Sequence, residues 1–112
     1  MRSQKLKEKK TMIKVKVTKE WIDIGNAKNN RECPIANCFN RGKGVKGVGH
    51  ALIFDTHSTL FLKKKINGKT PTLDFKHSDQ IKNFIEKFDN GGAVHPQEII
   101  FSKKNLERKR LI

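Results

Sequence analysis

The sequence is built around one stretch that holds both cysteines, Arg31-Glu32-Cys33-Pro34-Ile35-Ala36-Asn37-Cys38-Phe39-Asn40-Arg41. A proline at the first helical position loses no hydrogen bond, because that amide has no partner in a helix. The next apolar residues are spaced by three and four positions, so Ile35, Cys38 and Phe39 share one face. Gly42 is typical of a helix end. The stretch therefore predicts a short helix with one buried face.

Alternating and apolar runs on both sides of this helix predict strands. The run Ile13-Lys14-Val15-Lys16-Val17 alternates apolar and cationic residues, which is typical of a half-buried strand. Further strands are expected at 51–54, 59–62, 70–75 and 98–101. The pair Asn67-Gly68 is a favoured hairpin turn between the third and fourth of these five strands. Because Pro71 cannot donate to a strand ladder, 70–75 is predicted to be an edge strand.

Two further helices have clear starting residues. Thr18 is a good N-cap for a short helix over 19–24. Ser78 caps a longer helix over 78–89, whose apolar residues recur at helical spacing as Ile81, Phe84, Ile85 and Phe88. These elements predict an α+β fold, with two or three helices on one face of a mainly antiparallel sheet.

The length of 112 residues predicts a single domain. We expect this domain to span 12–102, between a disordered basic arm at 1–11 and a flexible basic tail at 103–112. A chain that starts at Met12 would contain every predicted helix and strand.

Positive charge dominates the composition. The net charge is +14 at pH 7, and the arm at 1–11 holds five cations against one carboxylate. Such a charge attracts polyanions, so the candidate partners are nucleic acid, an anionic membrane surface and an acidic protein. Because no apolar run approaches the roughly 20 residues that span a bilayer, we expect no membrane partner. The basic start lacks the apolar segment of a secretory signal, so we expect free thiols in a cytoplasmic protein.

The cations are unevenly distributed along the chain, which is typical of a nucleic-acid-binding face. The helix over 78–89 has more carboxylates than lysines, whereas four other segments are strongly basic. Lysine and arginine on such segments bind phosphates without reading bases. Since neither a DNA-recognition motif nor an exposed aromatic platform is evident, we predict binding to DNA or RNA without strong sequence preference. The predicted phosphate contacts are Arg2, Lys5, Lys7, Lys9, Lys10, Arg41, Lys43, Lys46, Lys63, Lys64, Lys65, Lys69, Lys103, Lys104, Arg108, Lys109 and Arg110.

The loop over 42–47 matches the pattern G-x-G-x-x-G. In a dinucleotide-binding fold this pattern follows a strand and opens a helix. Here a predicted helix precedes the loop and a strand follows it, so we reject that interpretation. A P-loop would also require Gly-Lys followed by Ser or Thr. The remaining expectation is a flexible cationic loop whose Lys43 and Lys46 lie along a phosphate backbone.

Cys33 is a candidate nucleophile. A helix N-terminus and the nearby Arg31 both lower a thiol pKa. A nucleophile also needs a positioned base, which any of the four histidines could supply: His50, His57, His77 and His95. The simpler alternative is a packed cysteine at a helix start. We favour this alternative and predict a protein that is not an enzyme and has no catalytic residue.

A metal site is a second alternative for the cysteines. The order Cys33, Cys38, His50, His57 lies near the spacing of a two-Cys, two-His zinc site. The gap between the histidines does not fit, and the cysteines lie on a predicted helix. We therefore predict neither a metal ion nor another cofactor.

Four segments together resemble a group of small tailed-phage and prophage proteins of unknown function. The segments are 17–25, with the pattern V-T-x-x-x-I-x-x-G, then Cys33-Pro34-Ile35-Ala36, then 84–89, which ends in Phe-Asp, and finally 94–99. The C-P-[VI]-A motif is the shared core, and the match spans about residues 12–101. The resemblance implies a compact α+β domain and a phage-type accessory protein without a catalytic residue. It also implies a place in the cytoplasm of a bacterial host or in a virion.

Three functions follow from these observations. The first is a non-enzymatic accessory protein that binds nucleic acid through a basic face and tails, alone or in a larger assembly. The second is an inhibitor of a host or defence protein, in which the positive charge matches an acidic groove. The third is an enzyme that uses Cys33. We favour the first function, with the second as the alternative.

Overall fold

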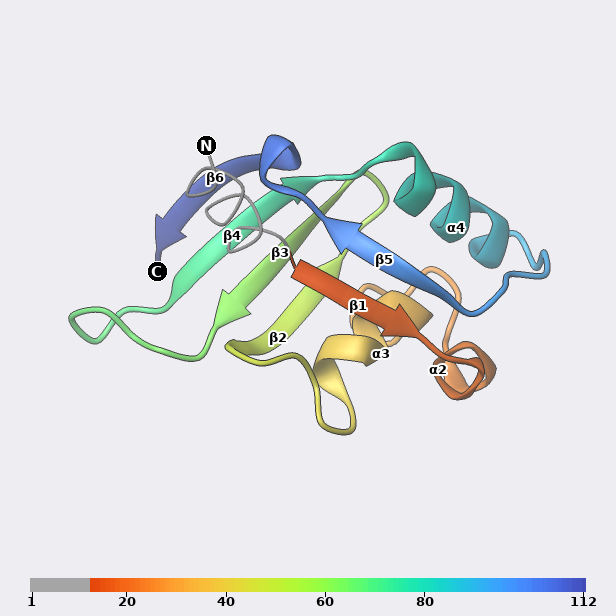
Figure 1. Cartoon of the computed structure of the whole chain (residues 1–112), viewed down its shortest axis with the longest axis horizontal. Helices are drawn as coiled ribbons and strands as arrows, with labels where there is room; N and C mark the ends of the chain where they lie inside the picture. Colours follow the sequence, from red (N-terminus) through yellow and green to blue (C-terminus); the bar gives the residue numbers. More distant parts are fainter. Residues whose placement is uncertain (1–12) are drawn as a thin grey trace, which may run out of the picture.

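A computed structural model describes residues 13–112 of the chain. This part holds three α-helices, six strands and one 3-10 turn, which follow one another as shown in Figure 1. The elements are β1 (Ile13–Val17), α2 (Lys19–Ile24), α3 (Pro34–Asn40), β2 (Val48–Ile53), β3 (His57–Leu62), β4 (Pro71–Lys76), α4 (Asp79–Asp89), β5 (Gln97–Phe101), η1 (Lys103–Asn105) and β6 (Leu106–Leu111).

The strands form two antiparallel sheets. One has four strands in the order β2-β3-β4-β6, and the other pairs β1 with β5. The predicted α+β class is therefore confirmed, with its strands divided between two sheets. The β1–β5 pair runs at an angle to the larger sheet in Figure 1.

Capping residues begin α2 and α4 as predicted. The Thr18 hydroxyl accepts a hydrogen bond from the Trp21 amide at 3.4 Å, and the Ser78 hydroxyl accepts one from the Ile81 amide at 3.4 Å. Each bond satisfies an amide that has no partner within its helix. The predicted helices over 19–24 and 78–89 are thus confirmed.

The turn between β3 and β4 has the predicted geometry. Asn67 and Gly68 have φ values of 52° and 78°. Two left-handed residues in succession form the type of turn that matches the twist of a hairpin. Ile66 and Lys69 exchange backbone hydrogen bonds of 2.9 Å in both directions across it.

The prediction of a flexible tail at 103–112 was wrong. These residues form η1 and β6, and β6 pairs with β4 from Phe75 opposite Leu106 to Pro71 opposite Leu111. For the same reason β4 is an inner strand, so the prediction of an edge strand at 70–75 was also wrong. The Arg110 guanidinium lies 2.9 Å from the carboxylate of Asp74 on β4. This ion pair holds the basic segment against the sheet.

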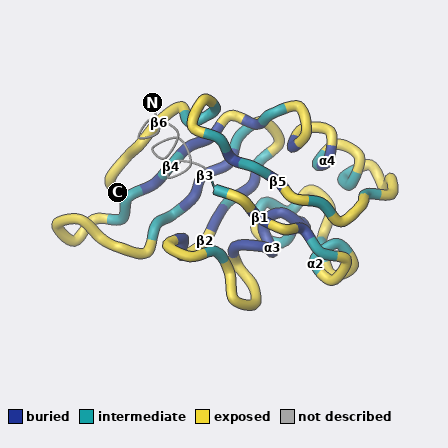
Figure 2. The backbone as a smooth tube through the Cα atoms, in the orientation of Figure 1, coloured by how far each residue is buried: buried dark blue, intermediate teal, exposed yellow. Residues whose placement is uncertain are grey.

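Phe101 of β5 joins the two sheets to α3. Its ring makes edge-to-face contacts with Phe75 of β4 at 5.5 Å and with Phe39 of α3 at 5.8 Å. Such aromatic pairs add specific geometry to apolar burial. The predicted inner face of α3 is also buried. Figure 2 shows the buried residues in dark blue along α3 and the central strands.

The end of α3 covers the free edge of β2. The Asn40 side chain accepts a hydrogen bond from the Ala51 amide at 2.8 Å and donates one to the Ala51 carbonyl at 3.0 Å. One amide side chain thereby satisfies the two backbone groups that a neighbouring strand would bond. This pairing fixes α3 beside the middle of β2.

Candidate nucleic-acid interface

The predicted phosphate contacts do not form one continuous site. Arg2, Lys5, Lys7, Lys9 and Lys10 lie outside the described residues. The remaining residues fall into three groups. The first follows α3 (Arg41, Lys43 and Lys46), the second connects β3 to β4 (Lys63, Lys64, Lys65 and Lys69), and the third lies on η1 and β6 (Lys103, Lys104, Arg108, Lys109 and Arg110).

The first group meets two further lysines at an open groove of about 590 Å³. Its cations are Lys14 and Lys16 from β1 and Arg41, Lys43 and Lys46 from the segment after α3. None of the described residues that line this groove is a carboxylate. We call this site the cationic groove. Its charges come from two separate segments of the chain. It is therefore the fold that brings these cations together.

The sequence already contained a signal for Lys14 and Lys16. Val15 and Val17 are 3% and 0% exposed, so the alternation of a strand places the two lysines on the outer face of β1. The alternation predicts the strand, but the predicted phosphate contacts do not include these two lysines.

Glycines shape the other wall of the groove. Gly42 and Gly44 have φ values of 60° and 66°, a region that other residues rarely adopt. A Cβ on Gly44 would lie 3.0 Å from the Phe39 carbonyl oxygen, and one on Gly42 would lie 3.1 Å from the Trp21 ring. The loop thus passes close to α3 and to the indole. This close passage brings Lys43 and Lys46 to the groove.

Trp21 of α2 also lines the cationic groove. The side chain is half-buried, and it also packs against the hydrophobic core. A half-buried indole is not an exposed aromatic platform, so this position does not contradict the prediction that none is evident. Trp21 is the only tryptophan in the chain, so its fluorescence reports on this groove alone.

Arg41 connects the groove to a second hollow of about 430 Å³, which His50 and Asn40 also line. The Arg41 guanidinium lies 3.3 Å from the Glu32 carboxylate and donates a hydrogen bond of 3.2 Å to the Asn37 side chain. These two contacts hold the guanidinium at the boundary between the hollows.

Beyond Arg41 lies the outer face of the four-stranded sheet, where two histidines stack on two phenylalanines. The rings of His50 and Phe61 lie 4.2 Å apart and are tilted by 10°, and those of Phe54 and His57 lie 4.8 Å apart and are tilted by 22°. The buried Ala51 and Leu60 are paired on the opposite, inner face. Sequence reasoning missed both aromatic pairs.

The cations of β6 are partly matched by a carboxylate. Both oxygens of Asp74 contact the Arg110 guanidinium, and the Thr59 hydroxyl donates to the same carboxylate at 2.6 Å. Burial alone would raise the Asp74 pKa, but the hydrogen bonds from Thr59 and Arg110 and the charges of Arg110 and Arg108 hold it below 3.8. Arg108 and Arg110 therefore stabilise the sheet, whatever they bind outside it.

The cysteines are not activated. Both thiols are free and buried. Burial raises the pKa of Cys33 to about 11, and burial with the charge of Cys33 raises that of Cys38 to about 12. The expectation of a lowered pKa for Cys33 was wrong, because loss of hydration outweighs the helix N-terminus. Both thiols remain protonated at neutral pH.

A serine–histidine pair is buried beneath the turn between β2 and β3. The Ser58 hydroxyl and His77 Nε2 lie 2.6 Å apart, and His77 Nδ1 lies 3.2 Å from the Asp55 carbonyl oxygen. This carbonyl requires the proton on Nδ1, so Nε2 accepts the serine hydrogen. Ser58 is 0% exposed and His77 is 3% exposed. Since no substrate can reach this hydroxyl in the folded protein, the pair ties the strands together.

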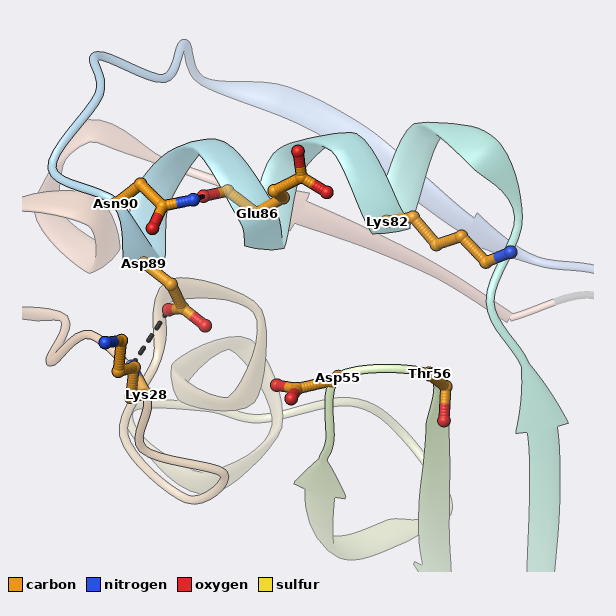
Figure 3. Close-up of a pocket in the computed structure, with 7 residues that line it drawn as sticks. All are labelled: Lys28, Asp55, Thr56, Lys82, Glu86, Asp89 and Asn90. Carbon is orange, nitrogen blue, oxygen red and sulfur yellow. Dashed lines mark hydrogen bonds between the residues drawn. The ribbon is translucent and has the colours of Figure 1, made fainter.

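The hollow in Figure 3 has mixed charge. It measures about 640 Å³ and lies between α4, the loop before α3 and the turn after β2. Three carboxylates (Asp55, Glu86 and Asp89) and two lysines (Lys28 and Lys82) line it. The Lys28 amide donates a hydrogen bond of 2.8 Å to the Asp89 carboxylate, which closes one side. We call this site the mixed hollow.

Residues 13–112 also bear on the metal and membrane predictions. No three His, Cys, Asp or Glu side chains of this part gather closely enough to hold a metal ion. The four residues considered for zinc are divided: the cysteines are buried, and His50 and His57 stack on separate phenylalanines. None of the helices in the same range is long and apolar enough to cross a membrane.

Comparison of the chain with protein-family models, with curated proteins and with solved structures finds no match.

Proposed function

We propose that this protein binds the phosphate backbone of nucleic acid along the cationic groove, without strong sequence preference and without catalysis. One observation carries the proposal: five cations from two separate segments line one groove, with no carboxylate among its described lining residues. Arg41 is paired with Glu32, whereas the four lysines of the groove have no ion pair within residues 13–112 and can neutralise phosphates. Each phosphate contact releases counterions, which favours binding at low salt.

The biological setting follows from the resemblance to small phage and prophage proteins. We place the protein among phage-type accessory proteins that act in the cytoplasm of a bacterial host or in a virion. A basic protein that binds nucleic acid without reading its sequence suits either place. The alternative partner, an acidic host or defence protein, would use the same cations.

Trp21 fluorescence provides a direct test. Random-sequence DNA and RNA are titrated into the full-length protein at several salt concentrations. We expect the fluorescence to change on binding, and the logarithm of the binding constant to fall against the logarithm of salt with a slope of about −4 for five contacts. The double variant Lys43→Ala/Lys46→Ala should reduce that slope by about 1.5.

The matched control removes two lysines from α4, as Lys82→Ala/Lys87→Ala. This variant has the same net charge but leaves the groove intact. An equal loss of affinity in both double variants would mean that the groove is not the site. Absence of binding at low salt would end the proposal, and the acidic-protein alternative would then be tested by direct binding of a labelled polyglutamate chain.

A further inference from the structure

We infer that the ligand is single-stranded nucleic acid, and that one of its bases stacks on the His50–Phe61 pair where the strand leaves the cationic groove past Arg41. This inference rests on the proposed function and names the class of its ligand.

The His50–Phe61 pair offers a flat surface to a base. The two rings are nearly parallel, with a tilt of 10° and a separation of 4.2 Å, and His50 is the exposed member. Proteins bind the unpaired bases of single strands by stacking them on aromatic side chains, histidine included. Since every base has a flat face, such stacking adds affinity without sequence preference.

The position of this pair is fixed relative to the groove. Asn40 exchanges two hydrogen bonds with the Ala51 backbone, at 2.8 and 3.0 Å. Arg41 follows Asn40, and His50 precedes Ala51, so the two hydrogen bonds hold Arg41 and His50 close together. Both side chains line the same hollow of about 430 Å³ together with Arg31 and Glu32, so arginines outnumber the one carboxylate in its lining. A nucleic-acid chain can therefore pass from the groove to the histidine with Arg41 between them.

Trp21 strengthens the case for unpaired bases. The indole lies on the groove side of Arg41 and His50 on the other side, so aromatic surfaces flank a cation in both directions. A cationic path with aromatic side chains along it is the usual arrangement for single strands. A duplex keeps its bases stacked inside and presents phosphates, so it would use the cations and leave His50 free.

The test compares two equivalent histidines. His50→Ala removes the exposed ring beside the groove, and His57→Ala removes the ring of the second stacked pair on the same sheet face. Full-length wild type and both variants are titrated with oligothymidine, oligouridine and a DNA duplex, and binding is measured by fluorescence anisotropy of labelled strands. The DNA and RNA arms distinguish the two sources of single strands.

We expect His50→Ala to weaken single-strand binding about 10-fold and to leave duplex binding unchanged. His57→Ala should leave both unchanged. If the remaining Phe61 ring supports stacking alone, the double variant His50→Ala/Phe61→Leu should show the loss, and circular dichroism should show that it is folded.

Three results would overturn the inference. The first is equal affinity of the wild type for single strands and duplex. The second is a mutational result that does not single out His50: either His50→Ala and His50→Ala/Phe61→Leu both leave single-strand binding unchanged, or His57→Ala loses as much affinity as His50→Ala. If Lys43→Ala/Lys46→Ala still weakens binding when the first or the second result is found, the proposed function stands without the stacking site. The third is a wild type that binds no nucleic acid, which overturns both.

Discussion

The cationic groove and the mixed hollow are similar in size but differ in charge. The groove measures about 590 Å³ and the hollow about 640 Å³. Five cations and no carboxylate are found among the described residues that line the groove, whereas three carboxylates and two lysines line the hollow. The mixed hollow shows that a high net charge does not make the lining of every depression cationic. The groove differs in that no carboxylate belongs to its described lining, although Arg41 pairs with Glu32 outside it.

The backbone explains this difference. In the groove, strand alternation exposes Lys14 and Lys16, and tight glycine turns bring Lys43 and Lys46 to them. In the hollow, α4 contributes Lys82, then Glu86 one turn later, and then Asp89. Helical neighbours of opposite sign compensate one another. Along the chain, the four lysines of the groove are flanked by valine, isoleucine and glycine, although Lys16 lies opposite Glu98 in the β1–β5 pair.

The largest expected effect on affinity comes from introducing carboxylates into the groove, so that its charge becomes mixed like that of the hollow. Charge reversal in Lys43→Glu/Lys46→Glu should lower affinity for nucleic acid more than about 100-fold at low salt, because two phosphate contacts become repulsive. The same reversal on α4, Lys82→Glu/Lys87→Glu, should cost less than about 3-fold. Anisotropy of a labelled oligonucleotide measures both. Similar losses would show that total charge governs binding.

The second prediction concerns cations that already have a partner. Asp74→Asn removes the carboxylate that Arg108 and Arg110 share, and it leaves the Thr59 hydroxyl with a weaker acceptor. We expect a loss of about 2 kcal/mol in the free energy of unfolding, because charge-assisted hydrogen bonds are lost at a nearly buried site. Urea denaturation followed by Trp21 fluorescence measures it. Unchanged stability would contradict the role of this ion pair in holding β6.

The cations of the groove and the arginines of β6 show how much of the fold the sequence could predict. Hydrophobic spacing and capping residues identified β1, α2, α3 and α4, because burial and end effects are local. The strand β6 was missed, since Leu106 to Leu111 has four charged residues between two leucines and no apolar alternation. Its partner Asp74 lies more than thirty positions earlier. Only the three-dimensional fold shows that this carboxylate faces the arginines.

The candidate site, too, could be predicted only in part from the sequence. Arg41, Lys43 and Lys46 were named from the sequence, and the two lysines of β1 could have been named from the alternation. The stacking of His50 on Phe61 depends on the β2–β3 register, which shifts between Val48 and His50. Such a bulge re-aims a side chain and leaves no reliable local signal. The aromatic pair therefore appears only in the structure.

The third prediction concerns the buried histidine beneath the rim of the mixed hollow. Burial lowers the pKa of His77 from 6.5 to about 4; the charges of His57 and Lys82 act in the same direction, and the carbonyl and charge of Asp55 oppose them. The unfolded chain takes up a proton below pH 6.5, whereas the folded protein does so only near pH 4. Stability is therefore complete above pH 6.5 and falls by about 1 kcal/mol per pH unit towards pH 4.

Urea denaturation at several pH values checks this dependence. The variant His77→Gln keeps a group that can bond to Ser58 but does not titrate, so its stability should lack the fall between pH 6.5 and 4. Asp74 has a lowered pKa and contributes stability that is lost only below pH 3.8, so the two windows are separate. A wild type that is equally stable at pH 6.5 and 4.5 would contradict the neutral buried imidazole.

The variants with the smallest expected effect on affinity give the strictest test of whether the charge of the groove or the total charge of the protein governs binding. Asp55→Asn/Glu86→Gln removes two carboxylates from the mixed hollow, while Lys43→Gln/Lys46→Gln removes two cations from the groove. The two variants change the net charge by equal and opposite amounts.

Figure 1 shows α4 and the loop after α3 on different sides of the molecule. Because charges further apart than about 8 Å are largely screened at physiological salt, we expect the first variant to raise affinity by no more than about 2-fold. The second should lower affinity several-fold more than that. Equal and opposite changes, measured at the same salt concentration, would show that the ligand senses the whole protein and that the groove is not a distinct site.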